Sequence, residues 1–266
     1  MMTIRPIYQV SAEVTALREL GPGYYFLTLK APEIAAAAEP GQFAQLRPAR
    51  VGTLDPLLAR PISIHRIFPQ TGEVAFIFKV VGRGTTLLAT FEPGETLTVL
   101  GPVGTGFTVS ETATRVALVG GGVGMPPLFC LAEALRRTRP EVTVELFYGG
   151  RTRDDLLLLP EWEALGVTVH LATDDGSRGH HGMVTGPLRE RLSSFEFLAA
   201  CGPRPMLVAV QQLALAAGVP GQLSLEAHMA CGVGACLGCI CATVSGNRRV
   251  CVDGPVFALE EVTFDA

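Results

Sequence analysis

A cysteine-rich stretch near the C-terminal end constrains this chain more than any other feature. It reads Cys231-Gly-Val-Gly-Ala-Cys236-Leu-Gly-Cys239-Ile-Cys241, and another cysteine follows at Cys251. A C-x4-C-x2-C spacing with a fourth, later cysteine is that of a plant-type [2Fe–2S] site. The intervening glycines let backbone N–H groups wrap closely around the negative charge that such a site accumulates. We therefore predict a [2Fe–2S] cluster in this stretch.

Other uses of cysteine fit the pattern less well. Structural zinc usually takes two C-x2-C or Cys/His pairs, and only Cys236 and Cys239 have that spacing. The seven cysteines are an odd number, which disfavours a disulfide framework. A Rieske site needs two histidine ligands, whereas His228 stands alone just upstream.

The extra thiol of Cys241 leaves the ligand set ambiguous. It lies two residues after Cys239, and in an extended segment both side chains point the same way. We expect Cys241 to be a buried small apolar side chain. The predicted ligands preserve the x4/x2 spacing and are Cys231, Cys236, Cys239 and Cys251.

Composition narrows the class of protein. A chain of 266 residues with 48% hydrophobic and 17% charged residues can form two folded domains with a small appendage, and disorder is disfavoured. The net charge of −4 and the absence of a basic run argue against nucleic-acid binding. No apolar stretch reaches the ~18 residues that span a bilayer. Residues 1–6 lack a signal-peptide pattern, so we expect a cytoplasmic protein with no membrane partner.

The first hundred residues read as short strands separated by glycine and proline. Turn sequences such as Gly21-Pro22-Gly23 and Glu92-Pro93-Gly94 favour antiparallel hairpins, and hence a small barrel. One short helix is expected at 85–91. The expected strands are 7–17, 24–30, 42–47, 60–68, 73–81 and 95–100.

Two features of this barrel suit a dinucleotide. Arg60-Pro61-Ile62-Ser63 offers a guanidinium for a pyrophosphate and a hydroxyl for a flavin ring nitrogen. The turn Gly82-Arg83-Gly84-Thr85 opens a helix, which favours anion binding. Taken separately, the first could be a surface arginine and the second a plain turn. Together they predict a phosphate cradle.

Residues 115–218 have a different pattern, in which strands of the buried type alternate with helical segments. Strands are expected at 115–119, 142–147, 167–171 and 195–200, which predicts a parallel sheet. The glycines Gly120, Gly121, Gly122 and Gly124 follow the first strand and precede a helix at 128–137, so a pyrophosphate could approach the backbone there. Cys201-Gly202-Pro203 ends the last strand, and Cys201 could contact a nicotinamide or belong to the core. Arg151 and Arg153 leave the choice between NAD and NADP open.

Taken in order, these motifs resemble the ferredoxin–NADP⁺ reductase superfamily: R-P-x-S in a flavin barrel, then G-G-x-G-x-x-P and C-G-P in a nucleotide domain. The C-terminal cysteines, followed by Asp253-Gly254-Pro255, narrow the resemblance to the electron-transfer subunits of NAD-dependent dihydroorotate dehydrogenases. The implied fold is α+β and multidomain. It comprises an antiparallel FAD barrel (1–108), an α/β parallel-sheet NAD domain (109–220) and a small [2Fe–2S] domain (221–266).

The resemblance also implies a function. In that family the subunit passes electrons from an FMN-containing catalytic subunit through the cluster and FAD to NAD⁺ in pyrimidine biosynthesis, in a heterotetramer of two copies of each subunit. The alternatives are the flavin subunit of a hydrogenase or ferredoxin-linked transhydrogenase, and a non-catalytic redox sensor. No separate catalytic residue is expected. The FAD-lining residues implied are Arg60, Pro61, Ile62, Ser63, Ile77, Phe78, Lys79, Gly84 and Thr85.

Overall fold

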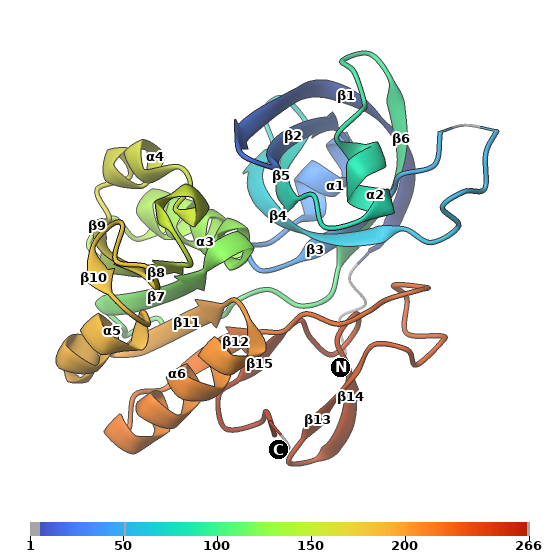
Figure 1. Cartoon of the computed structure of the whole chain (residues 1–266). Helices are drawn as coiled ribbons and strands as arrows, with labels where there is room; N and C mark the ends of the chain where they lie inside the picture. Colours follow the sequence, from blue (N-terminus) through green and yellow to red (C-terminus); the bar gives the residue numbers. More distant parts are fainter. Residues whose placement is uncertain (1–5, 51, 265–266) are drawn as a thin grey trace.

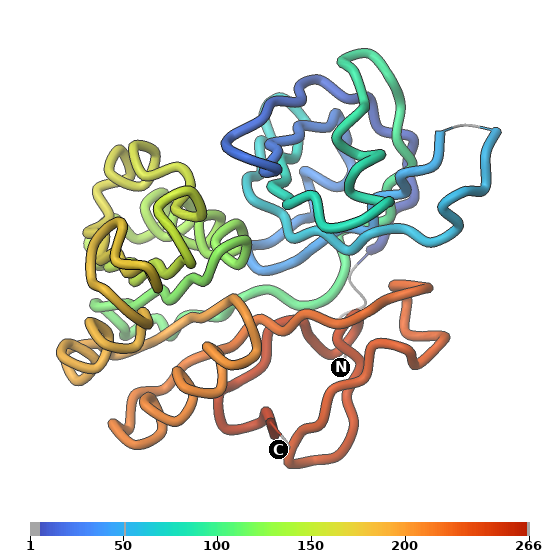
Figure 2. The backbone as a smooth tube through the Cα atoms, in the orientation of Figure 1, coloured from blue at the N-terminus to red at the C-terminus, as the bar shows by residue number. Residues whose placement is uncertain are grey.

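The computed structural model describes residues 6–50 and 52–264, which form three parts (Figure 1). A barrel comes first, a helix-covered sheet second and a cysteine-bearing segment last; Figure 2 follows the chain through them in that order. Residues 1–5, on which the expectation of no signal peptide partly rests, lie outside the described residues. None of the described helices is long and apolar enough to cross a membrane.

The barrel is closed, with strand order β1-β2-β5-β4-β3-β6 and antiparallel pairing throughout. Alternate side chains of each strand point into the barrel, as expected from the two-residue repeat of a strand. Val74, Phe76 and Phe78 of β5 point into the barrel core, whereas Ile77 between them packs toward the second part. Its elements are β1 (Tyr8–Gly21), β2 (Tyr24–Lys30), α1 (Pro32–Ala37), β3 (Phe43–Arg47), β4 (Arg60–Phe68), β5 (Glu73–Lys79), α2 (Arg83–Leu88) and β6 (Thr96–Val103).

The second part is a seven-stranded sheet of order β10-β9-β8-β7-β11-β12-β15. All neighbours are parallel except β12 and β15, which run antiparallel. The central strand β7 is apolar and buried, as expected for a strand covered by helices on both faces. The strands are β7 (Arg115–Gly121), β8 (Thr143–Gly150), β9 (Thr168–Thr173), β10 (His180–His181), β11 (Phe197–Cys201), β12 (Gly221–Ser224) and β15 (Val256–Ala258). The helices are η1 (Gly122–Gly124), α3 (Met125–Thr138), η2 (Arg153–Asp155), α4 (Leu159–Ala164), α5 (Thr185–Arg191), η3 (Leu192–Ser194) and α6 (Arg204–Ala217).

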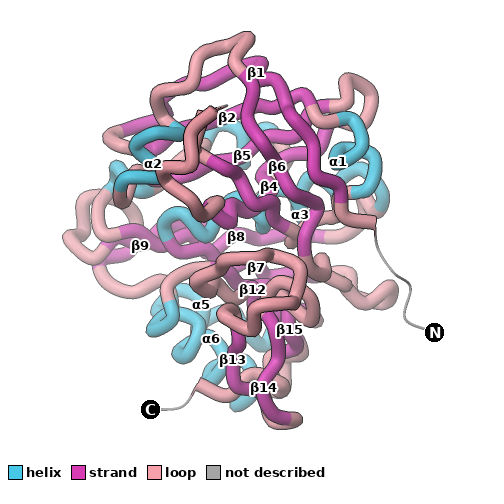
Figure 3. Tube along the Cα trace, turned by 90° about the vertical axis from the view of Figure 1, so that its right-hand side faces the viewer, coloured by secondary structure: helices cyan, strands magenta, loops and turns pink. Residues whose placement is uncertain are grey.

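The third part holds the cysteines and a small hairpin of β13 (Ile240–Thr243) and β14 (Gly246–Arg249). In Figure 3 the hairpin lies at the end of the molecule that is farthest from the barrel. One apolar core joins all three parts, because Phe43 of the barrel, Cys239 and Cys251 of the cysteine segment and the sheet residue Leu198 belong to the same buried cluster. The cysteine segment is therefore packed into the molecule.

Polar contacts also fix the barrel against the sheet. Lys79 Nζ of β5 pairs with Asp155 Oδ1 at 3.1 Å, and the Tyr24 hydroxyl donates to the same carboxylate. Arg66 of β4 pairs with Glu133 of α3. These contacts help to fix the position of the barrel relative to the sheet.

The expected fold class is confirmed, and the expected strands occur with ends that differ by a few residues. The elements for which no range was predicted include α1, β12 and β15. The strands β12 and β15 lie beyond residue 220, so the sheet continues into the segment assigned to the third domain. They are short, and β15 takes its place only by pairing with a strand some thirty residues earlier in the chain.

Candidate functional site

Arg60 and Gly84, predicted as parts of one phosphate cradle, lie together in the structure. Arg60 begins β4, and its guanidinium packs over Gly84 so closely that a Cβ on this glycine would overlap it. Arg60 Nη1 also donates to the carbonyl of Leu58 at 2.8 Å, which helps to hold the guanidinium in place. A guanidinium beside the first amides of α2 is a suitable setting for a pyrophosphate.

Thr85 builds the turn that precedes α2. Its hydroxyl accepts a hydrogen bond from the Val81 N–H at 2.9 Å and donates to the carbonyl of Gly82 at 2.9 Å. With the side chain used inside the turn, the backbone of Thr85 is what the turn offers to a ligand.

The outer face of β4 carries the predicted flavin contacts. Ser63 pairs with Phe43 of β3, and Pro61 pairs with Gln45, so these four residues share the outer face of the barrel. Ile62 points the other way, toward the barrel core. Ser63 is thus placed to reach a flavin lying outside the barrel, whereas the Ile62 side chain is not.

The β5 residues predicted at the flavin have different surroundings. Ile77 and Phe78 are 2% and 1% exposed, so only their backbone could contact a flavin. Lys79 is at the end of β5 and stays partly exposed, but its ammonium is engaged by Asp155 and by the Tyr24 hydroxyl at 2.8 Å. A flavin role for these three residues stays a prediction.

The glycine loop after β7 lies against the Cys201-Gly202-Pro203 turn after β11. A Cβ on Gly124 would overlap the backbone of Cys201, and one on Gly121 would overlap Met206 and Pro203. Only glycine allows these loops to meet, which explains the glycine run at the carboxyl edge of the sheet. The predicted nucleotide residues are therefore gathered at one edge, where α/β sheets bind dinucleotides.

Cys201 is buried, with only 2% of its surface exposed. Burial raises the pKa of its thiol to about 12, as does the nearby carboxylate of Glu226, while Ser224 acts in the opposite direction. The side chain therefore stays a neutral thiol at physiological pH and can pack against a ring without acting as a nucleophile.

Sequence reasoning missed Glu226. This residue follows β12, whose last residue, Ser224, pairs with Cys201. Glu226 reaches solvent on one side, yet loss of hydration around its carboxyl raises its pKa. No local motif marks Glu226, because its nearness to Cys201 depends on the pairing of β12 with β11.

The cysteine loop is shaped by backbone amides that face sulfur. The N–H groups of Val233 and Cys236 each donate to Cys231 Sγ at 3.4 Å. Partial burial opposes thiolate formation at Cys231, but these amides outweigh it and lower the pKa of the thiol to about 6. Gly232 and Gly234 take positive φ values of 70° and 77°, which turns successive amides to the same side. The loop is thus a nest for negative charge.

The four predicted ligands associate as two pairs. Cys236 lies within hydrogen-bonding reach of Cys231, and Cys239 lies within reach of Cys251. Among the described residues, no three Cys, His, Asp or Glu side chains converge as ligands of a single metal ion. A [2Fe–2S] cluster does not require this, because each of its two irons takes two protein ligands. The loop therefore suits a two-iron cluster better than zinc.

Cys241 lies on β13, where it pairs with Arg248 and packs partly against the shared core. This position agrees with an apolar role for its side chain. Its exclusion from the ligand set stays a prediction.

A buried amide beside the loop has no partner. Gln45 of β3 is 2% exposed, and neither its Nε2 nor its Oε1 makes a hydrogen bond within the described part of the chain. Its side chain touches Gly232, next to Cys231. The polypeptide thus leaves a hydrogen-bonding group free beside the site that the cysteines predict.

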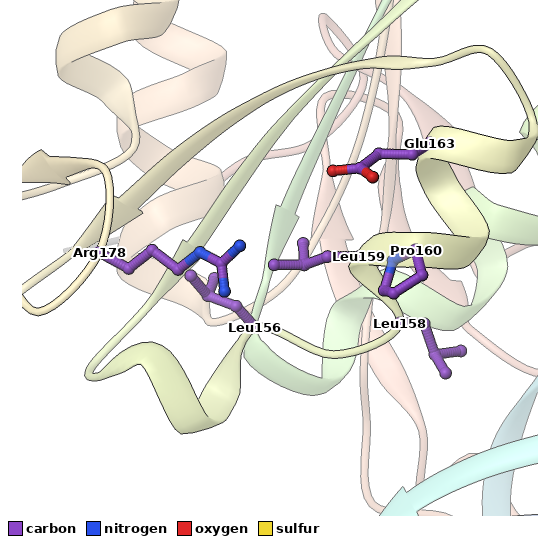
Figure 4. A pocket seen from close by; sticks show the side chains of 6 residues that line it. All are labelled: Leu156, Leu158, Leu159, Pro160, Glu163 and Arg178. Carbon is purple, nitrogen blue, oxygen red and sulfur yellow. The ribbon is translucent and has the colours of Figure 1, made fainter.

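A cavity of about 340 Å³ lies beyond the carboxyl end of β8, with none of the predicted site residues in its wall. Figure 4 shows Arg178 and Glu163 on either side of an apolar group that includes Leu159 and Pro160.

Two family models match this chain. The model described as the iron-sulfur cluster binding domain of dihydroorotate dehydrogenase B matches residues 226–263. The model described as an oxidoreductase NAD-binding domain matches residues 118–212. The matches cover the cysteine segment and most of the sheet.

Similar proteins carry the name dihydroorotate dehydrogenase B (NAD(+)), electron transfer subunit. The protein from Bacillus caldolyticus is 41% identical over 254 residues, which are 94% of this chain and 96% of its own length. The protein from Desulforamulus reducens is 37% identical over 260 residues, 96% of this chain and 98% of its own length.

Solved structures share the fold. A chain from an NADH-dependent reduced ferredoxin-NADP oxidoreductase superposes with a TM-score of 0.85 at 29% identity, covering 96% of this chain and 91% of that one. The ferredoxin reductase in carbazole 1,9a-dioxygenase gives a TM-score of 0.66 at 29% identity, covering 80% of this chain and 67% of that one. The sequence relatives named above are more similar than either structure.

Proposed function

Because this chain belongs to the family of electron-transfer subunits of NAD-dependent dihydroorotate dehydrogenase B, we propose that it works with a separate FMN-containing subunit that oxidises dihydroorotate. The proposed assembly is a heterotetramer of two copies of each subunit. The chain itself is an oxidoreductase component that uses FAD, a [2Fe–2S] cluster and NAD(H). The hydrogenase and transhydrogenase alternatives are not favoured, since the family model of the cysteine segment is that of dihydroorotate dehydrogenase B.

Flavin, when bound, supplies the chemistry that links the two ends, because it exchanges electron pairs with NAD(H) and single electrons with an iron–sulfur cluster. The chain's own residues bind and orient. Arg60 and Gly84 would hold the flavin's phosphates, Ser63 would meet its ring, and Gly120–Gly124 with Cys201 would receive NAD(H). Cys231, Cys236, Cys239 and Cys251 would hold the cluster.

One observation carries this proposal: the proposed flavin strand and the cysteine loop are separated by a single strand. The strand β3 pairs with β4 on one side, and its Gln45 touches Gly232 of the loop. Because electron transfer requires close cofactors, this adjacency supports passage from the loop to the flavin face. The proposal assigns FAD binding to residues 1–108, NAD binding to residues 109–220 and cluster binding to residues 221–266.

The exposed side of the cysteine loop is the proposed docking face for the partner. Val233 is 48% exposed and Leu237 is 60% exposed, and both lie between the predicted ligands. Met229, two residues before Cys231, packs partly against the shared core and is a weaker candidate. Apolar side chains exposed beside a redox site are typical of an interface.

The test is purification without air, followed by cofactor analysis and assembly. About one FAD, two irons and two sulfides per chain are expected. NADH-dependent dye reduction by the chain alone measures the flavin end. Dihydroorotate-dependent NAD⁺ reduction, after mixing with the FMN subunit, measures the whole path. Stoichiometric zinc without labile sulfide would contradict the cluster, and dye reduction without the coupled reaction would contradict the partner.

A further inference from the structure

Gln45 presents an unusual state for a buried amide. It is 2% exposed, and both of its polar atoms lack a hydrogen-bond partner within the described residues. An unpaired buried amide is costly, and native proteins rarely leave one without a reason. The state of Gln45 points to a partner that the polypeptide does not provide.

Gln42 shows that the region can satisfy a buried glutamine. It precedes β3 and is 1% exposed. Its Oε1 accepts from the Glu39 N–H at 2.7 Å, and its Nε2 donates to the carbonyl of Gly104 at 2.7 Å. Gln42 has hydrogen-bond partners within the barrel segment, whereas Gln45 lies against Gly232 of the cysteine loop.

The strand register places Gln45 on the outer face of the barrel. Ala44 and Leu46 on either side of it point into the barrel core, whereas Phe43 packs into the core that also contains Cys239. Gln45 therefore faces the cysteine segment, beside the proposed flavin strand.

Gly232 of the loop packs against the Gln45 side chain. A Cβ at that position would lie 2.9 Å from Gln45 Cγ and 3.1 Å from Nε2. Gly232 follows Cys231, and its φ of 70° keeps the loop backbone close to β3. The amide nitrogen is thus held on the barrel side of the cysteine nest.

We propose that Gln45 is a positioning residue that donates a hydrogen bond from Nε2 to a sulfur atom held at the Cys231 side of the loop. This inference rests on the proposed function, since it requires the cluster. Hydrogen bonds to cluster sulfurs help to set the reduction potential. A donor stabilises the reduced form of the cluster, which carries one more negative charge. Gln45, which lies on the side of the loop that faces the flavin strand, therefore raises the reduction potential of the cluster.

The first test is an anaerobic redox titration followed by electron paramagnetic resonance. Gln45→Leu removes the donor, and the ratio of reduced to oxidised cluster at a fixed potential should fall roughly tenfold, which equals about 59 mV for a one-electron couple. Gln45→His restores an N–H donor and should recover part of the shift. Gln42→Leu, the matched control, removes a buried glutamine whose amide is already bonded to Glu39 and Gly104, and it should leave the potential unchanged.

A second measurement can be made on the wild-type protein itself. In the reduced wild-type protein, ¹⁵N placed only in glutamine side-chain amides should produce a ¹⁵N coupling in pulsed spectra of the cluster. Gln42→Leu should keep that coupling and Gln45→Leu should lose it. An unchanged potential in Gln45→Leu overturns the assignment. If Gln45→Leu fails to fold, absence of the coupling in the wild type overturns it. A protein with FAD but no cluster contradicts the proposed function instead.

Discussion

His65 should make the protein lose stability in mild acid. Its ring is fully buried between Phe26 and Phe129, at centroid distances of 5.6 and 4.6 Å. Neither ring nitrogen has a hydrogen-bond partner within the described residues, although the nearby Pro126 backbone acts to raise the pKa. Burial, reinforced by the positive charge of Arg66, lowers the pKa of His65 to about 3.

The direction of the pH effect on stability follows from which state, folded or unfolded, takes up a proton at His65 first. An unfolded chain protonates this histidine below a pKa of about 6.5, whereas the folded protein resists protonation until about pH 3. The contribution of neutral His65 to the free energy of unfolding is therefore constant above about pH 6.5. It falls as the pH drops from 6.5 toward 3. Between pH 7.5 and 5.0 the loss is about 2 kcal/mol, from the two pKa values and the linkage relation.

The perturbation is His65→Phe, which keeps an aromatic ring and removes the titrating group. Thermal unfolding of the cofactor-loaded protein, followed by circular dichroism at both pH values, measures the effect. The difference in unfolding midpoint, variant minus wild type, should be about 4–8 °C larger at pH 5.0 than at pH 7.5, because the wild type loses stability that the variant keeps. His181→Gln, at an exposed histidine, is the control. Equal pH responses of His65→Phe and the wild type would refute a buried neutral imidazole.

Three further predictions concern the cofactors and the partner. Arg60→Ala should weaken FAD binding about 10- to 100-fold through loss of a charge-assisted contact, with iron content retained; unchanged FAD after dialysis would contradict the cradle. Cys236→Ser should lose the cluster absorbance and Cys241→Ser should keep it, because serine replaces a soft thiolate poorly; the reverse result would change the ligand register. Leu237→Asp should spare NADH–dye reduction and abolish the coupled reaction with the FMN subunit, because a charge in an interface core is costly. Val244→Asp, at an exposed position in the hairpin turn, should spare both activities, and retention of the coupled reaction in Leu237→Asp would place the docking face elsewhere.

Local patterns were sufficient for much of the fold. Glycine–proline turns delimited the barrel strands, and buried apolar runs such as that of β7 identified the parallel sheet. The pairing of Arg60 with Gly84 was expected from chemistry alone, since each suits phosphate, and the structure brings them together.

The missed features depend on contacts between distant segments. Gln45 reads in sequence as the outward polar residue of an alternating strand, and only its contact with Gly232 gives it meaning. Glu226 carries no motif, and its relevance comes from the pairing of β12 with β11. Ile77 and Phe78 were predicted to line the flavin from a linear motif, and tertiary packing buries both side chains, which leaves their backbone for that predicted role.

The strand β15 has a consequence for how the molecule moves. It follows Cys251 and pairs with β12 through Val256, Phe257 and Ala258, so the chain returns to the large sheet after leaving the cysteine loop. It also covers an edge of β12 that would otherwise present unpaired amides to other molecules. A segment tied into the sheet at both ends cannot swing as a tethered arm. The spacing between the cysteine loop and the barrel is thus built in during folding and does not need to be found by diffusion in each catalytic cycle.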